Sequence, residues 1–359
     1  MVDRIHVDRL TDIVATILER AGAERSIATE VADNLVEADI VGRHSHGARL
    51  TASYVDRLKR GVIDGRARPE IVSATGSLIR IDGRQAFGQI VGQLAAATGA
   101  RAAKEHGVAV VAVTNSGQFG RNGKWAEIAA GEGIASLHFV NGPGSPPAVV
   151  PFGAREGRLG TNPIAIGAPR GDGTPFVVDF SVGEVAGNIV KLAYERGERL
   201  PRPSIMRADG ALSDDPADFM AAGMKGIVAF GGYKGTALAL FADIFAGALT
   251  GGGCQTGDIG PPKPRTNNML SIFLNPEAFV DKAYFGAEVD ALLAWVRSAA
   301  PASDDVPVTV PGDRTAAARM RQEADGIVFD DSLRSLLAGL ADTVDPSGQL
   351  RVRWPELSN

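Results

Sequence analysis

The chain has 359 residues, of which 45% are hydrophobic, and a formal net charge of −5. This composition predicts a globular protein of about two domains and argues against a dedicated binder of nucleic acid or anionic membrane. The single cysteine, Cys254, excludes an internal disulfide and fits a reducing cytoplasm. No export signal and no apolar run of roughly 18 residues is found, so we expect a cytoplasmic protein.

The first 60 or so residues read as helices. Residues 7–22 place a stripe of apolar side chains on one face, formed by Leu10, Ile13, Val14, Ile17 and Leu18. A second helix is predicted over residues 26–42 with Ser26 as its cap, and a third ends at Gly61. The quartet His-Ser-His-Gly at residues 44–47 therefore lies at the junction between the second and third helices.

From about residue 70 strands and helices alternate. Strands are predicted at 78–83, 108–115, 134–141, 175–181 and 269–275, with helices at 95–107, 124–133 and 237–249. This pattern predicts an N-terminal helical domain over 1–75, an α/β domain over 76–280 and a helical segment over 281–359 that packs on the first domain. Residues 140–153 and 253–268 read as irregular loops of a length that is often functional.

The histidine pair is a poor metal site, because helical residues two apart point to different sides and no cluster of ligands accompanies it. We predict no metal. His46 precedes Gly47 and a helix start, where the positive helix end keeps an imidazole neutral and available for proton transfer. A surface or capping histidine is the simpler interpretation of this pattern alone.

Three further patterns each leave a functional and an ordinary interpretation open. Gly117, Gly120 and Gly123 follow a buried strand and precede a helix, which suits a phosphate but is also typical of a simple turn. Lys234 enters a helix, where it meets a ligand anion or only solvent. Asp179 closes an apolar strand, where a carboxylate needs a partner: a helix end to cap, or a histidine to orient.

Taken together, the segments resemble the malate/L-lactate dehydrogenase family with a non-Rossmann cofactor fold, which includes hydroxycarboxylate, ureidoglycolate and sulfolactate dehydrogenases and diketogulonate reductase. The matching pieces are HSHG, AFGQ, GRNGKWAE, VVPFG, LGTNPIA, VVDFS, YKG, FLNPE and VPGDR, in this order over about 300 residues. The resemblance implies an α/β fold: a non-Rossmann NAD(P)-binding α/β domain with a helical domain built from both chain ends.

The resemblance also implies roles for individual residues. It makes His46 the residue that moves a proton to and from the substrate, Ser45 a hydrogen-bond partner of the substrate, and Asp179 the group that orients and balances the histidine. It places the cofactor, NAD or NADP, along Gly120, Val178, Asp179, Phe180, Ser181, Lys234, Asn267, Gly312, Asp313 and Arg314.

Two departures from the family pattern affect the substrate site. Many relatives carry an arginine four residues after the histidine, where this chain has Leu50, so Arg49, Arg57 and Arg121 become the candidates for binding a substrate carboxylate. Relatives commonly have a histidine where this chain has Gln118, which forms hydrogen bonds but exchanges no proton near neutral pH. We therefore assign the proton to His46 and expect Gln118 to contact substrate or cofactor.

The expected reaction is transfer of a hydride between nicotinamide and C2 of a 2-hydroxy or 2-oxo carboxylic acid. The alternatives are a reductase of cyclic imino acids on the same scaffold and a catalytically silent homologue, for which Gln118 is the argument. The resemblance further implies a homodimer or larger homo-oligomer, with the cofactor site near the subunit interface.

Overall fold

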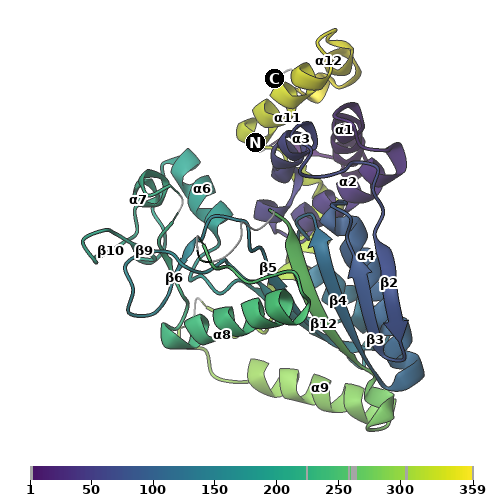
Figure 1. Ribbon diagram of the computed structural model, residues 1–359. Helices are drawn as coiled ribbons and strands as arrows, with labels where there is room; N and C mark the ends of the chain where they lie inside the picture. The colour runs from purple at the N-terminus through teal and green to yellow at the C-terminus, as the bar shows by residue number, and fades with distance from the viewer. Residues whose placement is uncertain (1–2, 224, 258, 260–264, 304–305, 358–359) are drawn as a thin grey trace.

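The computed structural model describes residues 3–223, 225–257, 259, 265–303 and 306–357. Three bodies are visible in Figure 1: a layer of helices, a large sheet with helices on its faces, and a smaller lobe beside the sheet. Within the described residues, no helix is both long and apolar enough to cross a membrane.

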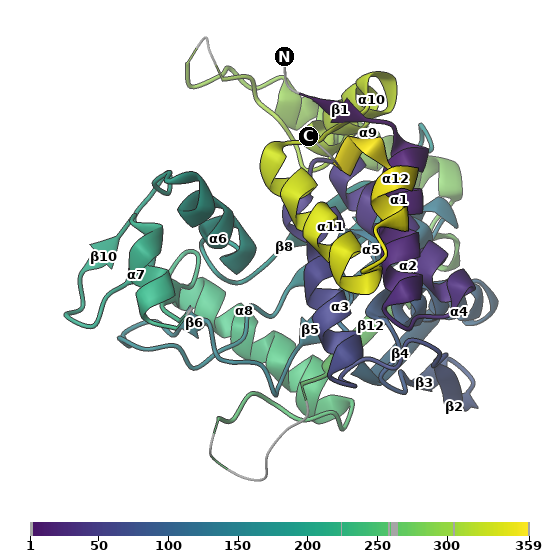
Figure 2. The ribbon, with the colours of Figure 1, turned by 90° about the horizontal axis from the view of Figure 1, so that it is seen from above.

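Both ends of the chain build the helical layer, as expected. Helices α1 (Val7–Arg20), α2 (Arg25–Ile40) and α3 (Thr51–Lys59) share one buried core with α11 (Asp331–Val344) and α12 (Gln349–Arg353). Figure 2 shows α11 and α12 lying against α1, α2 and α3. The pairing of β1 (Arg4–Ile5) with β13 (Ile327–Val328) and the turn at Pro355–Leu357 complete this layer.

Local sequence explains the first two helices, with one correction. The whole apolar stripe predicted for α1 is buried. The predicted cap Ser26 is wrong, because α2 begins at Arg25 with Glu24 before it, and no side-chain cap is made there. The hydroxyl of Ser26 instead donates to Oε1 of Glu24 at 2.6 Å, so its hydrogen bond goes to a side chain rather than to the helix end.

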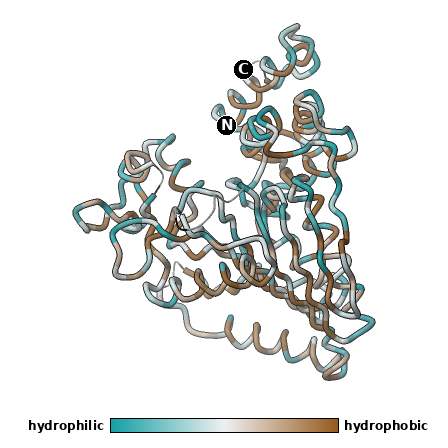
Figure 3. Tube along the Cα trace, viewed as in Figure 1, coloured by the Kyte–Doolittle hydropathy of each residue, from teal (hydrophilic) through white to brown (hydrophobic). Residues whose placement is uncertain are grey.

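The large sheet has seven strands in the order β2-β3-β4-β12-β5-β7-β8, and among these pairs only β3 and β4 run parallel. The strands are β2 (Glu70–Thr75), β3 (Leu78–Asp82), β4 (Val108–Ser116), β12 (Asn267–Leu274), β5 (Ala135–Asn141), β7 (Ile164–Ala168) and β8 (Phe176–Phe180). Helices α4 (Gly88–His106) and α5 (Gly123–Gly131) cover one face, and α8 (Tyr233–Asp243) with the π-helical turn Ile244–Leu249 packs on β5 and β12. Figure 3 shows apolar residues gathered along the strands and along α8.

The smaller lobe is built from short elements between β5 and β12. A sheet in the order β10-β9-β11-β6 joins Leu212–Ser213, Ile205–Met206, Ile227–Val228 and Val149–Val150. Helices α6 (Gly187–Arg196) and α7 (Pro216–Ala221) enclose a small core with it. The segment 140–153, expected to be an irregular loop, thus contributes the strand β6, which pairs in parallel with β11.

The remaining elements lie near or beyond residues 75 and 280, where the sequence predicted domain boundaries. These boundaries stay predictions. Strand β2, which ends at residue 75, belongs to the large sheet. After the turn at Pro276–Ala278, α9 (Lys282–Arg297) contacts the β7–β8 turn, where Nε of Arg170 donates to Asp290 at 2.8 Å. Helix α10 (Asp313–Asp325) follows and packs against α2. Of the predicted loop 253–268, residues 258 and 260–264 lie outside the described residues.

Candidate active site

The His-Ser-His-Gly quartet forms a tight turn that is held by the buried carboxylate of Asp39 on α2. One oxygen of Asp39 accepts the backbone N–H of Ala48 at 2.7 Å, and the other lies 2.8 Å from Nδ1 of His44. Gly47 is required here, because a Cβ at this position would lie 2.2 Å from Asp39. His44 therefore braces the turn, whereas His46 faces a cavity.

His46 is contacted by its neighbour Ser45, which a second element holds in place. The hydroxyl oxygen of Ser45 lies 3.1 Å from Nδ1 of His46. The side-chain amide of Asn188, on α6, donates to the carbonyl oxygen of Ser45 at 2.9 Å. The smaller lobe thus contacts the helical layer directly at the turn that carries the histidine.

Burial and charge together set the protonation of His46. Burial lowers its pKa below the usual range, the charge of Asp179 opposes this shift, and the positive charges of Arg43 and Arg121 reinforce it. The imidazole is therefore neutral at pH 7. A neutral ring that stands beside a carboxylate is able to accept a proton and to be stabilised once charged.

Asp179 lies near the end of β8 and meets the start of α5. Its Oδ2 accepts the backbone N–H of Gly123, the first residue of α5, at 2.8 Å. A carboxylate at this position satisfies a free donor of the helix and interacts favourably with its dipole. The sequence left a helix cap and a histidine partner open as roles. The structure combines them: Asp179 caps α5, not the helix that follows it in the chain, and its charge also acts on His46.

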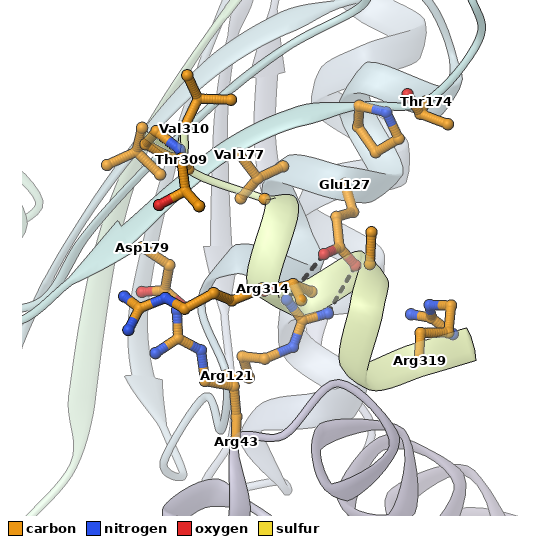
Figure 4. A pocket seen from close by; sticks show the side chains of 16 residues that line it. Arg43, Arg121, Glu127, Thr174, Val177, Asp179, Thr309, Val310, Arg314 and Arg319 are labelled. Carbon is orange, nitrogen blue, oxygen red and sulfur yellow. Dashed lines mark hydrogen bonds and ion pairs between the residues drawn. The ribbon is translucent and has the colours of Figure 1, made fainter. Parts of the chain in front are cut away.

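Two cavities meet at this point. One of about 470 Å³ contains His46, and one of about 550 Å³ lies between β8 and the start of α10. Asp179, Arg43 and Arg121 line both. In Figure 4 the side chains of Arg43 and Arg314 extend toward Asp179, whereas Arg121 turns away to Glu127. The histidine is thus placed beside one end of a longer cleft.

Most of the residues expected at the site line these cavities. Around the smaller one the structure places Ser45, His46, Gln118, Arg121, Asp179, Phe180 and Ser181. Around the larger one it places Arg121, Val178, Asp179, Gly312 and Arg314. Gln118 lines the smaller cavity together with His46, although its amide exchanges no proton near neutral pH.

Four of the residues that the resemblance assigned to the cofactor line neither cavity: Gly120, Lys234, Asn267 and Asp313. The carboxylate of Asp313 binds the guanidinium of Arg297 at 2.7 Å, and so holds the turn before α10. The side-chain amide of Asn267 donates to a backbone carbonyl of β5. Gly120 adopts a φ of +71° in the turn before α5, and Lys234 is exposed at the start of α8.

Two of the three arginines expected to bind a substrate carboxylate also line neither cavity. Arg49 makes an ion pair with Asp330, at the start of α11, through contacts of 2.5 and 2.7 Å. Arg57 is half-buried on α3. Arg49 is therefore a link between the two ends of the chain rather than a group that faces the site.

Arg121 lines both cavities, but two carboxylates already neutralise it. Its guanidinium binds Glu127 at 2.6 Å and Glu37 at 3.0 Å. Burial alone would lower the pKa of Arg121, and these two carboxylates raise it instead. Its positive charge is thus permanent but already paired.

Arg43 is the functional candidate that sequence reasoning missed. It is exposed, lines both cavities, and has no hydrogen bond or ion pair from its guanidinium within the described part of the chain. The only signal in the sequence is its place three residues before His46. Across the same described residues, no group of three or more His, Cys, Asp or Glu is arranged to hold a metal ion.

Solved structures with a similar fold include a dehydrogenase and a reductase. Sulfolactate dehydrogenase from Methanocaldococcus jannaschii matches with a TM-score of 0.83 at 30% identity, over 95% of this chain and 97% of that one. Δ1-Piperideine-2-carboxylate reductase from Pseudomonas syringae matches with a TM-score of 0.82 at 28% identity, over 94% and 100%. The fold thus places the chain among such dehydrogenases and reductases.

The family follows from the sequence comparison. The family model for malate/L-lactate dehydrogenase matches residues 5–338. Hydroxycarboxylate dehydrogenase B from Escherichia coli O157:H7 is 33% identical over 329 residues, covering 91% of this chain and 90% of that protein. The chain belongs to the malate/L-lactate dehydrogenase family, as the sequence motifs indicated.

Proposed function

We propose that this dehydrogenase interconverts a 2-hydroxy acid and a 2-oxo acid with His46 as its general acid and base. One observation carries the proposal: a half-buried imidazole, whose pKa is lowered by its surroundings, stands beside Asp179 where two cavities meet. This arrangement gives the histidine access to a small molecule in one cavity and to a cofactor that extends from the other. General acid–base groups work best when their pKa is adjusted by such surroundings.

The larger cavity fits a nicotinamide dinucleotide. The start of α10 borders it, where free backbone N–H groups and the helix dipole favour phosphate. Gly312, with a φ of +101°, provides the close turn before this helix, and Arg314 adds a cation without a side-chain partner among the described residues. We propose that Val178, Gly312 and Arg314 hold the cofactor, NAD or NADP. When bound, the nicotinamide exchanges a hydride with C2 of the substrate.

The side chains of this chain would then manage the proton. In oxidation, the neutral imidazole of His46 takes the proton from the substrate hydroxyl. In reduction, the protonated ring donates to the forming alkoxide, and Asp179 stabilises the charged ring until the donation. Ser45 and Gln118 offer hydrogen bonds to the substrate oxygen atoms from the same cavity. The protein contributes orientation and placement of charge.

The test is turnover of a panel of 2-oxo acids with NADH and NADPH in parallel, followed by the near-ultraviolet absorbance of the reduced nicotinamide. His46→Gln is expected to lower kcat by about 10³-fold, while cofactor binding, read from nicotinamide fluorescence, is kept. His6→Gln, at an exposed position on the surface, is the matched control and keeps full activity. Retention of turnover by His46→Gln would refute the assignment.

The second candidate is a reductase of cyclic imino acids, and the structural match to a piperideine-carboxylate reductase favours it. The same histidine would then donate its proton to the ring nitrogen. Preference for Δ1-piperideine-2-carboxylate or Δ1-pyrroline-2-carboxylate over pyruvate and phenylpyruvate would decide for it. Turnover of any of these compounds would exclude a catalytically silent homologue.

We also propose that the enzyme is a homodimer in the cytoplasm. Apolar side chains are exposed along α8 and the π-helical turn after it: Leu240, Phe241, Ile244 and Leu249. An apolar surface of this kind is typical of an interface between subunits. The dimeric mass by light scattering is expected to fall to that of a monomer in Ile244→Lys. Cys254, the only thiol of the chain, fits a reducing compartment.

A further inference from the structure

The 2-oxo acid of the proposed reaction carries a carboxylate, and a buried carboxylate needs a cation. Four arginines either line the smaller cavity or were expected at the substrate site, and their charges are not equally available: Arg43, Arg49, Arg57 and Arg121. Arg121 is paired with Glu37 and Glu127, and Arg49 is paired with Asp330. Only the cations that remain can receive a substrate anion.

Arg43 has the freest charge among the arginines that reach the smaller cavity. Among the described residues, its guanidinium has no side-chain or backbone partner, and it lines the cavity together with His46 and Gln118. The remaining arginines of the cleft, Arg314 and Arg319, border the larger cavity alone.

The backbone of Arg43 is fixed although its side chain is not. Its N–H donates to the carbonyl of Ala38 at 2.7 Å, and its own carbonyl accepts the N–H of His46 at 2.8 Å. The point at which the side chain leaves the backbone is therefore set relative to the histidine, and its guanidinium makes no hydrogen bond or ion pair among the described residues. This combination of a rigid base and an unpaired end is what binding of an anion next to the proton donor requires.

We propose that Arg43 binds the carboxylate of the substrate, in place of the arginine that relatives carry four residues after the histidine. This inference rests on the proposed function, since it concerns the same site. A planar guanidinium binds a carboxylate through two parallel hydrogen bonds, which orients C2 as well as holding it. The carboxylate of a cyclic imino acid would bind in the same way.

A consequence for the proton follows from the charges around His46. Arg43 and Arg121 hold the pKa of His46 down together with burial, and Asp179 opposes them. Glu184, on the segment between β8 and α6, lines the same cavity. A carboxylate on Arg43 would neutralise one of the two positive charges. Binding of the 2-oxo acid thereby favours the protonated histidine that its reduction needs.

The test compares the full-length enzyme with Arg43→Gln, Arg43→Lys and the exposed control Arg60→Gln. Pyruvate and its neutral amide, pyruvamide, are the paired substrates. For Arg43→Gln we expect KM for pyruvate to rise about 100-fold with KM for NADH unchanged and activity on pyruvamide kept. Arg43→Lys, which keeps the charge but not the paired geometry, should recover part of the loss. In the oxidative direction, the midpoint of the pH profile should move upward in Arg43→Gln.

Binding of oxamate, an unreactive carboxylate, to the enzyme with NADH provides a readout without turnover. Calorimetry is expected to show binding to the wild type and to Arg60→Gln, and a loss of about 100-fold in Arg43→Gln. Unchanged oxamate binding, equal losses with pyruvate and pyruvamide, or a raised KM for NADH alone would overturn the proposal. The last result would place Arg43 on a cofactor phosphate. A wild type that binds oxamate through Arg43 but reduces no 2-oxo acid would refute the proposed function and leave this inference standing.

Discussion

The ion pair with Asp330 indicates that Arg49 has a structural role rather than a functional one. A double-mutant cycle measures the coupling energy of this pair. The pair joins two side chains that are 19% and 31% exposed, through contacts of 2.5 and 2.7 Å, and Ser332 adds a third contact at 2.9 Å. Two charges about 4 Å apart interact by roughly 4 kcal/mol at an effective dielectric constant near 20. Desolvation and the ordering of both side chains cost more than half of this interaction energy, which leaves a net stabilisation of about 1–2 kcal/mol.

The variants are Arg49→Gln, Asp330→Asn and their combination. Asparagine keeps an oxygen that can cap α11 through the N–H of Leu333, so the cycle isolates the charge. Burial alone would raise the pKa of Asp330, but the hydrogen bonds from Leu333 and Arg49 hold it below its usual range. The coupling is therefore present at neutral pH and is lost as the pH falls through the titration of this carboxyl group.

The assay is urea unfolding of the four proteins at pH 7, followed by circular dichroism, together with KM for the 2-oxo acid. We expect a coupling energy of about 1–2 kcal/mol and an unchanged KM in Arg49→Gln. A coupling energy near zero would show that the contact adds no stability. A large rise in KM with unchanged stability would show that Arg49 reaches the substrate. The structural role assigned to Arg49 would then be wrong.

Three more changes test other parts of the molecule. Asp39→Asn weakens the hydrogen bonds that hold the turn at residues 44–47. If His46 acts as proposed, kcat should fall, and the free energy of unfolding should drop by about 1–3 kcal/mol, with cofactor affinity kept as the control. Burial lowers the pKa of His138 to about 3, so as the pH falls the unfolded chain takes up a proton at this histidine before the folded protein does. The free energy of unfolding should therefore fall by about 1.4 kcal/mol per pH unit below pH 6.5 from this group. His138→Gln should show a correspondingly flatter pH dependence of stability. In Gly99→Ala the new Cβ would lie 2.1 Å from the ring of buried Phe273, which predicts a loss of about 1–3 kcal/mol in urea unfolding, whereas Gly131→Ala, with no atom within 4 Å, should be neutral or stabilising.

Helical periodicity predicted α1, because its apolar stripe reports directly on one buried face. The strand β4 was predicted from a continuous apolar run, which is typical of a buried strand. The order of the strands could not be found, because β12 lies between β4 and β5 although more than a hundred residues separate it from either. The two-residue strands of the smaller lobe carry no periodic signal, since pairing across the chain defines them.

Motifs in the sequence brought together residues that line one cavity, but they carried no information on which charged side chains are paired with each other. His46, Ser45, Gln118 and Asp179 were chosen from the sequence, and the structure places all four around one cavity. The arginines could not be ranked, because the charge of Arg49 is taken by a residue 281 positions away. A side chain that is free, as in Arg43, is recognised only once the partners of all the others are known.

The two segments that form the shared core are synthesised at different times. During synthesis the first 60 residues, which include the turn at residues 44–47, leave the ribosome long before residues 327–357, which complete the same core. Until Ile327 pairs with Ile5 and Asp330 meets Arg49, the nascent N-terminal helices lack part of their packing. Each new molecule of this enzyme should therefore gain activity only after residues 327–357 have left the ribosome.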